Sequence, residues 1–158
     1  MNPMQSLAAK IKRWGAEFGF QQVGISDCDL GEAEVHLRQW LQQGFHGEME
    51  YMARHGDMRS HPQLLLEGTL RVISVRMDYL PDSSEDIFTL LSDPAAAFIA
   101  RYALGRDYHK TLRRRLAKLA RRISEEAGGA TQRVFVDSAP VLEKPLAQKA
   151  GLGWIGKH

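Results

Sequence analysis

The stretch DYHKTLRRRLAKLARRISEEAGG (residues 107–129) carries the strongest helical pattern in this 158-residue sequence. Its apolar residues recur every three or four positions, as on one face of an amphipathic helix. That stripe consists of Tyr108, Leu112, Leu116, Leu119 and Ile123. Asp107 is the predicted N-cap and Gly128 the predicted end of the helix.

Shorter elements are expected on both sides of this helix. Strands are predicted at residues 21–26, 69–80, 98–104 and 133–138. Further helices are predicted at residues 6–18, 32–43, 87–91 and 140–151, and turns at 49–53 and 81–86. Ser6 is the expected N-cap of the first helix and Gly19 its end, while the second should bury Val35, Leu37, Trp40 and Leu41. Helices alternate with strands, so the pattern predicts an α/β (α+β) layered domain whose strand order it does not fix.

Composition narrows the class of protein. The chain is 44% hydrophobic and 25% charged, with a net charge of +2, as in an ordinary globular domain. No apolar run approaches the ~20 residues that span a bilayer, and charges interrupt the first segment, so a cytoplasmic protein is expected. Cys28 is the single cysteine, which excludes a disulfide framework or an iron–sulfur cluster built within this chain.

The long helix also carries a basic face, which has two possible interpretations. Six cations fall within ten residues, and they are Arg113, Arg114, Arg115, Lys118, Arg121 and Arg122. One interpretation is a solvated outer face, partly paired with Glu125 and Glu126. The other is contact with a phosphate backbone, which would give affinity without reading sequence.

Two clusters could carry chemistry. GRDYH (residues 105–109) places Asp107 and His109 at the start of the long helix. In FVDSAPVLEKPLAQKAGLGWIGKH (135–158), Asp137 is expected at a strand end, where α/β domains present side chains to a crevice. A carboxyl group enclosed there by Phe135 and Trp154 would have a raised pKa and could donate a proton.

A nucleotide site has weak support. GLGWIG (151–156) matches G-x-G-x-x-G, but it follows a predicted helix rather than a strand. A flavin- or nucleotide-dependent reductase therefore remains a minor alternative. The histidines lack H-x-x-x-H spacing, so no metal site is predicted.

RYALGRDYHKTLRRRL (101–116) and residues 135–158 closely resemble two signature blocks of the tRNA epoxyqueuosine reductases. GFQQVGIS (19–26), FHGEMEYMARH (45–55) and LLLEGTLRVISVRMDYLP (64–81) match that family in order and spacing. The resemblance implies reduction of epoxyqueuosine to queuosine at the tRNA wobble position, in the anticodon loop. It also implies a nitroreductase-like, reductive-dehalogenase-like domain that binds cobalamin.

On this resemblance, residues 1–158 form an incomplete N-terminal cobalamin-binding domain. The family's ferredoxin-like module with two 4Fe-4S clusters and its helical repeats would lie outside the chain, and an external donor would supply electrons. These residues alone are therefore expected to be inactive. A non-catalytic module that binds cobalamin or docks tRNA is the alternative.

The resemblance also assigns residues. Asp137 matches the family's proton donor beside the cobalamin, which agrees with the carboxylate expected at a strand end. Arg59 and Ala100 align with cobalamin-contacting positions, and the contact expected at Ala100 is one that its backbone can make. Asp107 and His109 lie in the block that lines the substrate side.

Overall fold

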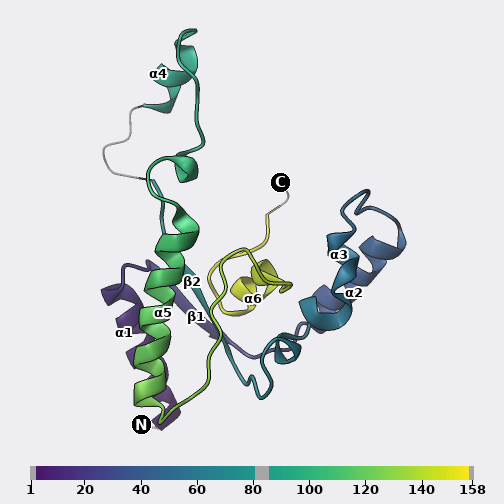
Figure 1. Ribbon diagram of the computed structural model, residues 1–158, viewed down its shortest axis with the longest axis vertical. Helices are drawn as coiled ribbons and strands as arrows, with labels where there is room; N and C mark the ends of the chain where they lie inside the picture. The colour runs from purple at the N-terminus through teal and green to yellow at the C-terminus, as the bar shows by residue number, and fades with distance from the viewer. Residues whose placement is uncertain (1–2, 81–85, 157–158) are drawn as a thin grey trace.

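The computed structural model describes residues 3–80 and 86–156, with side chains from residue 6 onward (Figure 1). The chain is a mixed α/β structure. Its helices and strands are α1 (Pro3–Glu17), β1 (Gln22–Ser26), α2 (Gly31–Gln42), α3 (Tyr51–Arg54), β2 (Val72–Arg76), α4 (Ile87–Ser92), α5 (Tyr108–Glu126) and α6 (Glu143–Lys149). Three 3₁₀ turns lie at Gly56–Arg59, Pro62–Leu64 and Arg101–Ala103. No described helix is long and apolar enough to cross a membrane.

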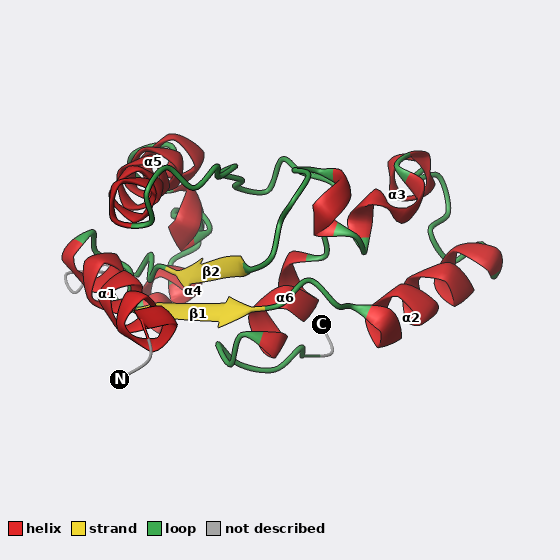
Figure 2. Ribbon diagram, turned by 90° about the horizontal axis from the view of Figure 1, so that it is seen from below, coloured by secondary structure: helices red, strands yellow, loops and turns green. Residues whose placement is uncertain are grey.

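A small antiparallel sheet forms the centre of the described structure. β1 pairs with β2 in a register that runs from Gln22 opposite Arg76 to Ser26 opposite Val72. Successive side chains of a strand point to opposite faces, so the two faces of β1 contact different helices. Val23 and Ile25 pack against the core formed by α1 and α5, whereas α6 contacts both strands (Figure 2).

The main core lies between the sheet, α1 and α5. Its buried members are Ile11, Trp14, Phe20, Leu119 and Ile123. Half-buried Leu112 and Leu116 extend the contact along α5, so the predicted apolar stripe of this helix is confirmed. Gly19 has a φ of 82°, which confirms its predicted place at the end of α1.

Gly24 permits the close approach of α6 to β1. A Cβ atom at this position would lie 2.4 Å from the backbone oxygen of Ala150 and 2.7 Å from its Cβ. Only a residue without a side chain fits between β1 and the end of α6. This contact fixes the helix that follows Asp137 against the sheet.

Two predicted strands are wrong. Residues 98–104 form an extended segment and a 3₁₀ turn, and residues 133–138 form an irregular segment that ends in a bend. Phe98, Ile99 and Val134 to Val136 have high strand propensity. A strand nevertheless needs a hydrogen-bonding neighbour, and neither segment pairs with one in the described part of the chain.

Smaller expectations also need correction. Ser6 lies inside α1 rather than at its N-cap, and the helix predicted from Pro140 begins at Glu143. α2 has no buried residue, and Val35 is exposed, because α2 lies on an arm away from the main core (Figure 1). The predicted turn at 81–86 lies almost wholly outside the described residues.

Candidate functional site

The first turn of α5 positions two of the predicted site residues. The Asp107 carboxylate caps the helix by accepting a hydrogen bond from the His109 backbone N–H at 2.9 Å, as predicted. Desolvation alone would raise the pKa of Asp107. The backbone N–H groups of His109 and Lys110 outweigh it, so the pKa is lowered and the carboxylate stays charged.

Asp137 lies at the bend before α6 in a left-handed backbone conformation. Its φ is 53°, the one positive value among the described non-glycine residues. Asp and Asn tolerate this region better than other side chains do. Strained backbone of this kind persists where surrounding contacts hold it and often marks functional sites.

Tyr108 holds the Asp137 side chain. Its hydroxyl donates to Asp137 Oδ2 at 2.5 Å. This hydrogen bond to a carboxylate raises the pKa of Tyr108 to about 12. The phenol ring packs edge-on against Tyr102, with 5.8 Å between centroids, and stacks on the His109 ring at 4.0 Å.

His109 lies between two carboxylates. Its Nδ1 is 3.3 Å from Asp107 Oδ1, and its Nε2 is 3.7 Å from Asp137 Oδ2. Each ring nitrogen therefore faces a different acid. A histidine so placed offers one ring nitrogen to each carboxylate.

Glu143, the first residue of α6, adds a second acid beside Asp137. Desolvation of its carboxyl group raises its pKa, and the nearby Asp137 charge raises it further, although the Asp137 backbone N–H acts in the opposite direction. Glu143 is exposed as a whole residue, yet its carboxyl group is partly desolvated. Its electrostatic interaction with Asp137 adds the start of α6 to the group around that carboxylate.

The structure contradicts the expected enclosure of Asp137. The Asp137 side chain is 52% exposed, and Trp154 is 87% exposed. Nor does Asp137 follow a strand, because the preceding segment is irregular. The electrostatic environment of Asp137 is therefore set by its neighbours Tyr108, His109 and Glu143 rather than by burial.

Arg59 has a different setting. Its buried guanidinium donates to the carbonyl oxygens of Met52 at 3.0 Å and Tyr51 at 2.7 Å. Its own carbonyl accepts from the Leu142 N–H at 2.9 Å, just before α6. Arg59 thus joins the α3 segment to the start of α6. Among the described residues, no hydrogen bond or ion pair joins it to the Asp137 carboxylate.

Ala100 lies next to the site along the chain. It is exposed, and its carbonyl accepts from the Ala103 N–H at 2.9 Å at the start of a 3₁₀ turn. That turn contains Tyr102, which packs against Tyr108. The structure therefore brings together Asp107, His109 and Asp137, with Ala100 nearby.

Tyr108 and Glu143 were missed as site residues. The helical period assigned Tyr108 to the apolar stripe of α5, and that stripe gave no reason to expect a partner for its hydroxyl. Tyr108 follows the N-cap directly, and this place at a helix start was the available signal. Glu143 had no comparable signal in the sequence.

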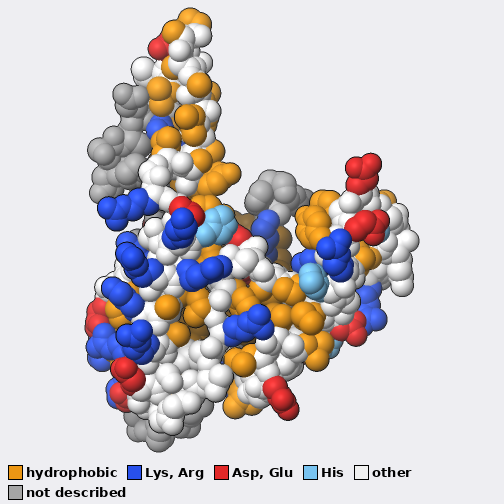
Figure 3. All heavy atoms as spheres, viewed as in Figure 1, with side chains coloured by type: hydrophobic (Ala, Val, Ile, Leu, Met, Phe, Trp, Pro, Cys, Tyr) orange, Lys and Arg blue, Asp and Glu red, His pale blue; other side chains and the backbone are white. Residues whose placement is uncertain are grey.

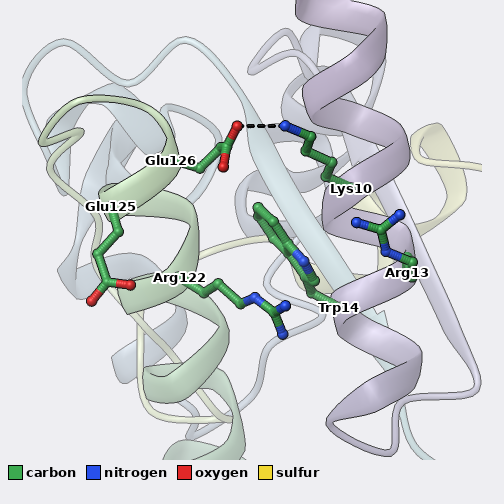
Figure 4. A pocket seen from close by; sticks show the side chains of 6 residues that line it. All are labelled: Lys10, Arg13, Trp14, Arg122, Glu125 and Glu126. Atoms are coloured by element: carbon green, nitrogen blue, oxygen red, sulfur yellow. Dashed lines mark hydrogen bonds and ion pairs between the residues drawn. The ribbon is translucent and has the colours of Figure 1, made fainter.

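A pocket of about 410 Å³ lies far from this group, between α1 and the C-terminal end of α5. Its lining side chains are Lys10, Arg13, Trp14, Arg122, Glu125 and Glu126 (Figure 4). Lys10 Nζ lies 2.5 Å from Glu126 Oε1, and the Arg122 guanidinium lies 4.8 Å from the Trp14 ring centroid. These contacts join the two helices, so the pocket belongs to the helix packing.

The Tyr108–Asp137 hydrogen bond predicts a spectroscopic result. Wild-type protein should show a phenol ionisation near pH 12, and Tyr108→Phe should lack it. Folding favours the neutral phenol, so this contribution to stability is present below about pH 10 and is lost as the pH rises toward 12. Absorbance at the tyrosinate band during an alkaline titration measures it. Tyr79→Phe, at an exposed position, should leave that ionisation in place, and its loss there would contradict the assignment.

The comparisons with known proteins agree with this architecture. The family described as "Epoxyqueuosine reductase QueG, DUF1730" matches residues 59–138. The epoxyqueuosine reductase of Pseudomonas aeruginosa is 61% identical over 152 residues, covering 96% of this chain and 42% of that protein. The Escherichia coli epoxyqueuosine reductase is 58% identical over 155 residues, covering 98% of this chain and 41% of that protein.

A solved structure shares the fold. The epoxyqueuosine reductase from Streptococcus thermophilus superposes with a TM-score of 0.72 at 25% identity, covering 99% of this chain and 40% of that one. The fold and the site thus define a mixed α/β domain with an acid group held between α5 and α6. The chain belongs to the epoxyqueuosine reductase QueG family. It spans about 40% of the length of the curated relatives it matches.

Proposed function

We propose that this chain contributes the substrate-facing acid and the cobalamin-binding surface of an enzyme that reduces epoxyqueuosine to queuosine in tRNA. The observation that carries the proposal is the group formed by Asp137, Tyr108 and His109. Asp137 has a strained, left-handed backbone, and its carboxylate accepts a hydrogen bond from Tyr108 and faces His109. Because the proposed substrate is tRNA, the reaction would take place in the cytoplasm.

The acid has a defined task. Opening one C–O bond of the epoxide leaves an alkoxide on the neighbouring carbon. An alkoxide is a poor leaving group near neutral pH, so a positioned proton donor speeds the loss of that oxygen as water. Tyr108 donates to Oδ2 of Asp137, and His109 Nε2 faces the same oxygen at 3.7 Å, so Oδ1 is the oxygen left open toward a substrate. His109 faces the same carboxyl group and can return a proton to it, while Asp107 holds the histidine ring from its other side.

The surface around this acid suits the flat, apolar face of a corrin ring. Exposed apolar side chains flank the site before α5 and after α6, and they include Phe98, Ile99, Tyr102, Leu104, Trp154 and Ile155. Figure 3 shows the molecule hollowed between the arm that carries α4 and the arm that carries α2 and α3. Ala100 and Asp137 would hold the corrin here, and Arg59 would act by anchoring the start of α6. When bound, cobalamin would supply the reducing chemistry.

The groups that transfer electrons to the cobalamin would come from protein outside these residues. Cys28 is the single cysteine in the sequence, and burial raises the pKa of its thiol, so it is a core residue rather than a cluster ligand. Two 4Fe-4S clusters and an external donor would deliver electrons. The two-stranded sheet would form part of a larger nitroreductase-like layer.

The alternative function is a module that binds cobalamin or docks tRNA without catalysis. The exposure of Asp137 favours it for the isolated chain, since a proton donor open to water is poorly shielded. A flavin- or nucleotide-dependent reductase has less support, because Gly151 to Gly156 follow α6 rather than a strand.

Two measurements test the proposal. The 158-residue chain is titrated with hydroxocobalamin, and a saturable change in the visible spectrum is expected. A chimera in which these residues replace the equivalent segment of the Pseudomonas aeruginosa relative is then assayed for conversion of epoxyqueuosine in tRNA. Turnover by the chimera supports catalysis, and cobalamin binding without turnover favours the non-catalytic module. A flavin spectrum or no cobalamin binding would contradict the proposal.

A further inference from the structure

α5 carries seven Lys and Arg residues, and two of them are engaged within the fold. Arg115 turns inward, where its Nη1 donates to the Gly19 carbonyl and to Met77 Sδ, both at 3.2 Å. Arg122 pairs with Glu17 at 2.5 Å and lies over the Trp14 ring. These two arginines hold α5 against α1 and the sheet, so their guanidinium groups are already engaged within the fold.

Four other cations of α5 form an exposed row, which we call the basic stripe: Lys110, Arg114, Lys118 and Arg121. Their spacings of four, four and three residues place them on one helix face, opposite the apolar stripe that faces the core. The row is about 17 Å long at the rise of an α-helix. Figure 3 shows Lys and Arg side chains gathered along this helix.

The basic stripe is largely unneutralised. Its single ion pair among the described residues joins Lys110 to Asp107 at 3.9 Å. The acids of α5 are confined to its last turn, at Glu125 and Glu126. A face that serves solubility alone usually intersperses both signs of charge. An aligned row of one sign attracts polyanions instead.

The basic stripe leads to the acid group. Lys110 follows His109 directly, and neighbouring Arg113 reaches Ser138 Oγ at 3.4 Å, one residue beyond Asp137. A strand lying along the stripe would therefore present its next nucleotides at the N-terminal end of α5. We propose that the basic stripe binds consecutive phosphates of the RNA substrate and guides the strand to Asp137. This inference rests on the proposed function and adds the surface that positions the RNA.

The test measures salt-dependent binding of the 158-residue chain to a fluorescent RNA stem–loop of anticodon-arm size, without epoxyqueuosine. The variant combines Arg114→Gln, Lys118→Gln and Arg121→Gln. A matched control removes the same charge from exposed positions elsewhere, by Lys12→Gln, Arg13→Gln and Arg71→Gln. Each lost phosphate contact lowers the slope of log affinity against log salt by roughly 0.7 to 0.9. The stripe variant should therefore lose about 2 to 3 units of slope, and the control should keep its slope.

Circular dichroism verifies that both variants are folded. An unchanged slope in the stripe variant, or an equal loss in the control, would overturn the proposal. It would also be overturned if the stripe variant kept its RNA affinity but lost binding to phosphatidylserine vesicles, because the partner would then be a membrane. The RNA is unmodified and no reduction is measured, so this outcome is independent of the chimera assay.

Discussion

We expect Asp137→Asn to lower the turnover number of the chimera by about 10²- to 10⁴-fold, the usual contribution of a positioned acid. Asparagine keeps the size of the side chain and tolerates the left-handed backbone of this position, where φ is 53°. It can still accept from Tyr108, but it has no proton to transfer. Because asparagine keeps the size of the side chain that would contact the corrin, cobalamin should still bind, and the circular dichroism spectrum should be unchanged. Single-turnover kinetics with epoxyqueuosine-containing tRNA measure the effect.

Asp107→Asn is the matched control for this prediction. Asparagine caps a helix as well as aspartate does, so α5 should keep its start, and only the charge beside His109 is lost. We expect a smaller loss of turnover than in Asp137→Asn. Equal losses, or normal turnover in Asp137→Asn, would show that Asp137 is not the proton donor.

We expect Leu146→Ala to lower the free energy of unfolding by about 2 to 5 kcal/mol, as for other deletions of a fully buried leucine side chain. Leu146 is 2% exposed and belongs to α6, which packs on both strands of the sheet. The substitution leaves a cavity beneath the helix whose first residue, Glu143, faces Asp137. Urea denaturation followed by circular dichroism measures the loss.

Leu64→Ala is the control for the packing effect. Leu64 is 60% exposed, so its truncation should change the free energy of unfolding by no more than about 0.5 kcal/mol. If both variants lost the same free energy, α6 would not be packed on the sheet as described.

Local patterns predicted a large part of the fold. The α5 helix, its Asp107 cap, its apolar stripe and the β2 strand follow from residue spacing and propensity, which act over a few neighbouring residues. The irregular segments at 98–104 and 133–138 could not be predicted in this way. Their residues favour strands, but pairing depends on a neighbouring strand, which local patterns do not identify.

The sequence by itself determined that Asp137 and Asp107 are candidate acids and that α5 is strongly basic. Tertiary structure alone decided how these residues act. Packing of α5 beside the bend before α6 brings Tyr108 within 2.5 Å of Asp137, 29 residues away. The same packing turns Arg115 and Arg122 inward and leaves the basic stripe exposed. The physical reason is that the spacing of residues along the sequence determines on which face of a helix a side chain lies. Which other segment packs against that face depends on contacts between residues that are distant in the sequence.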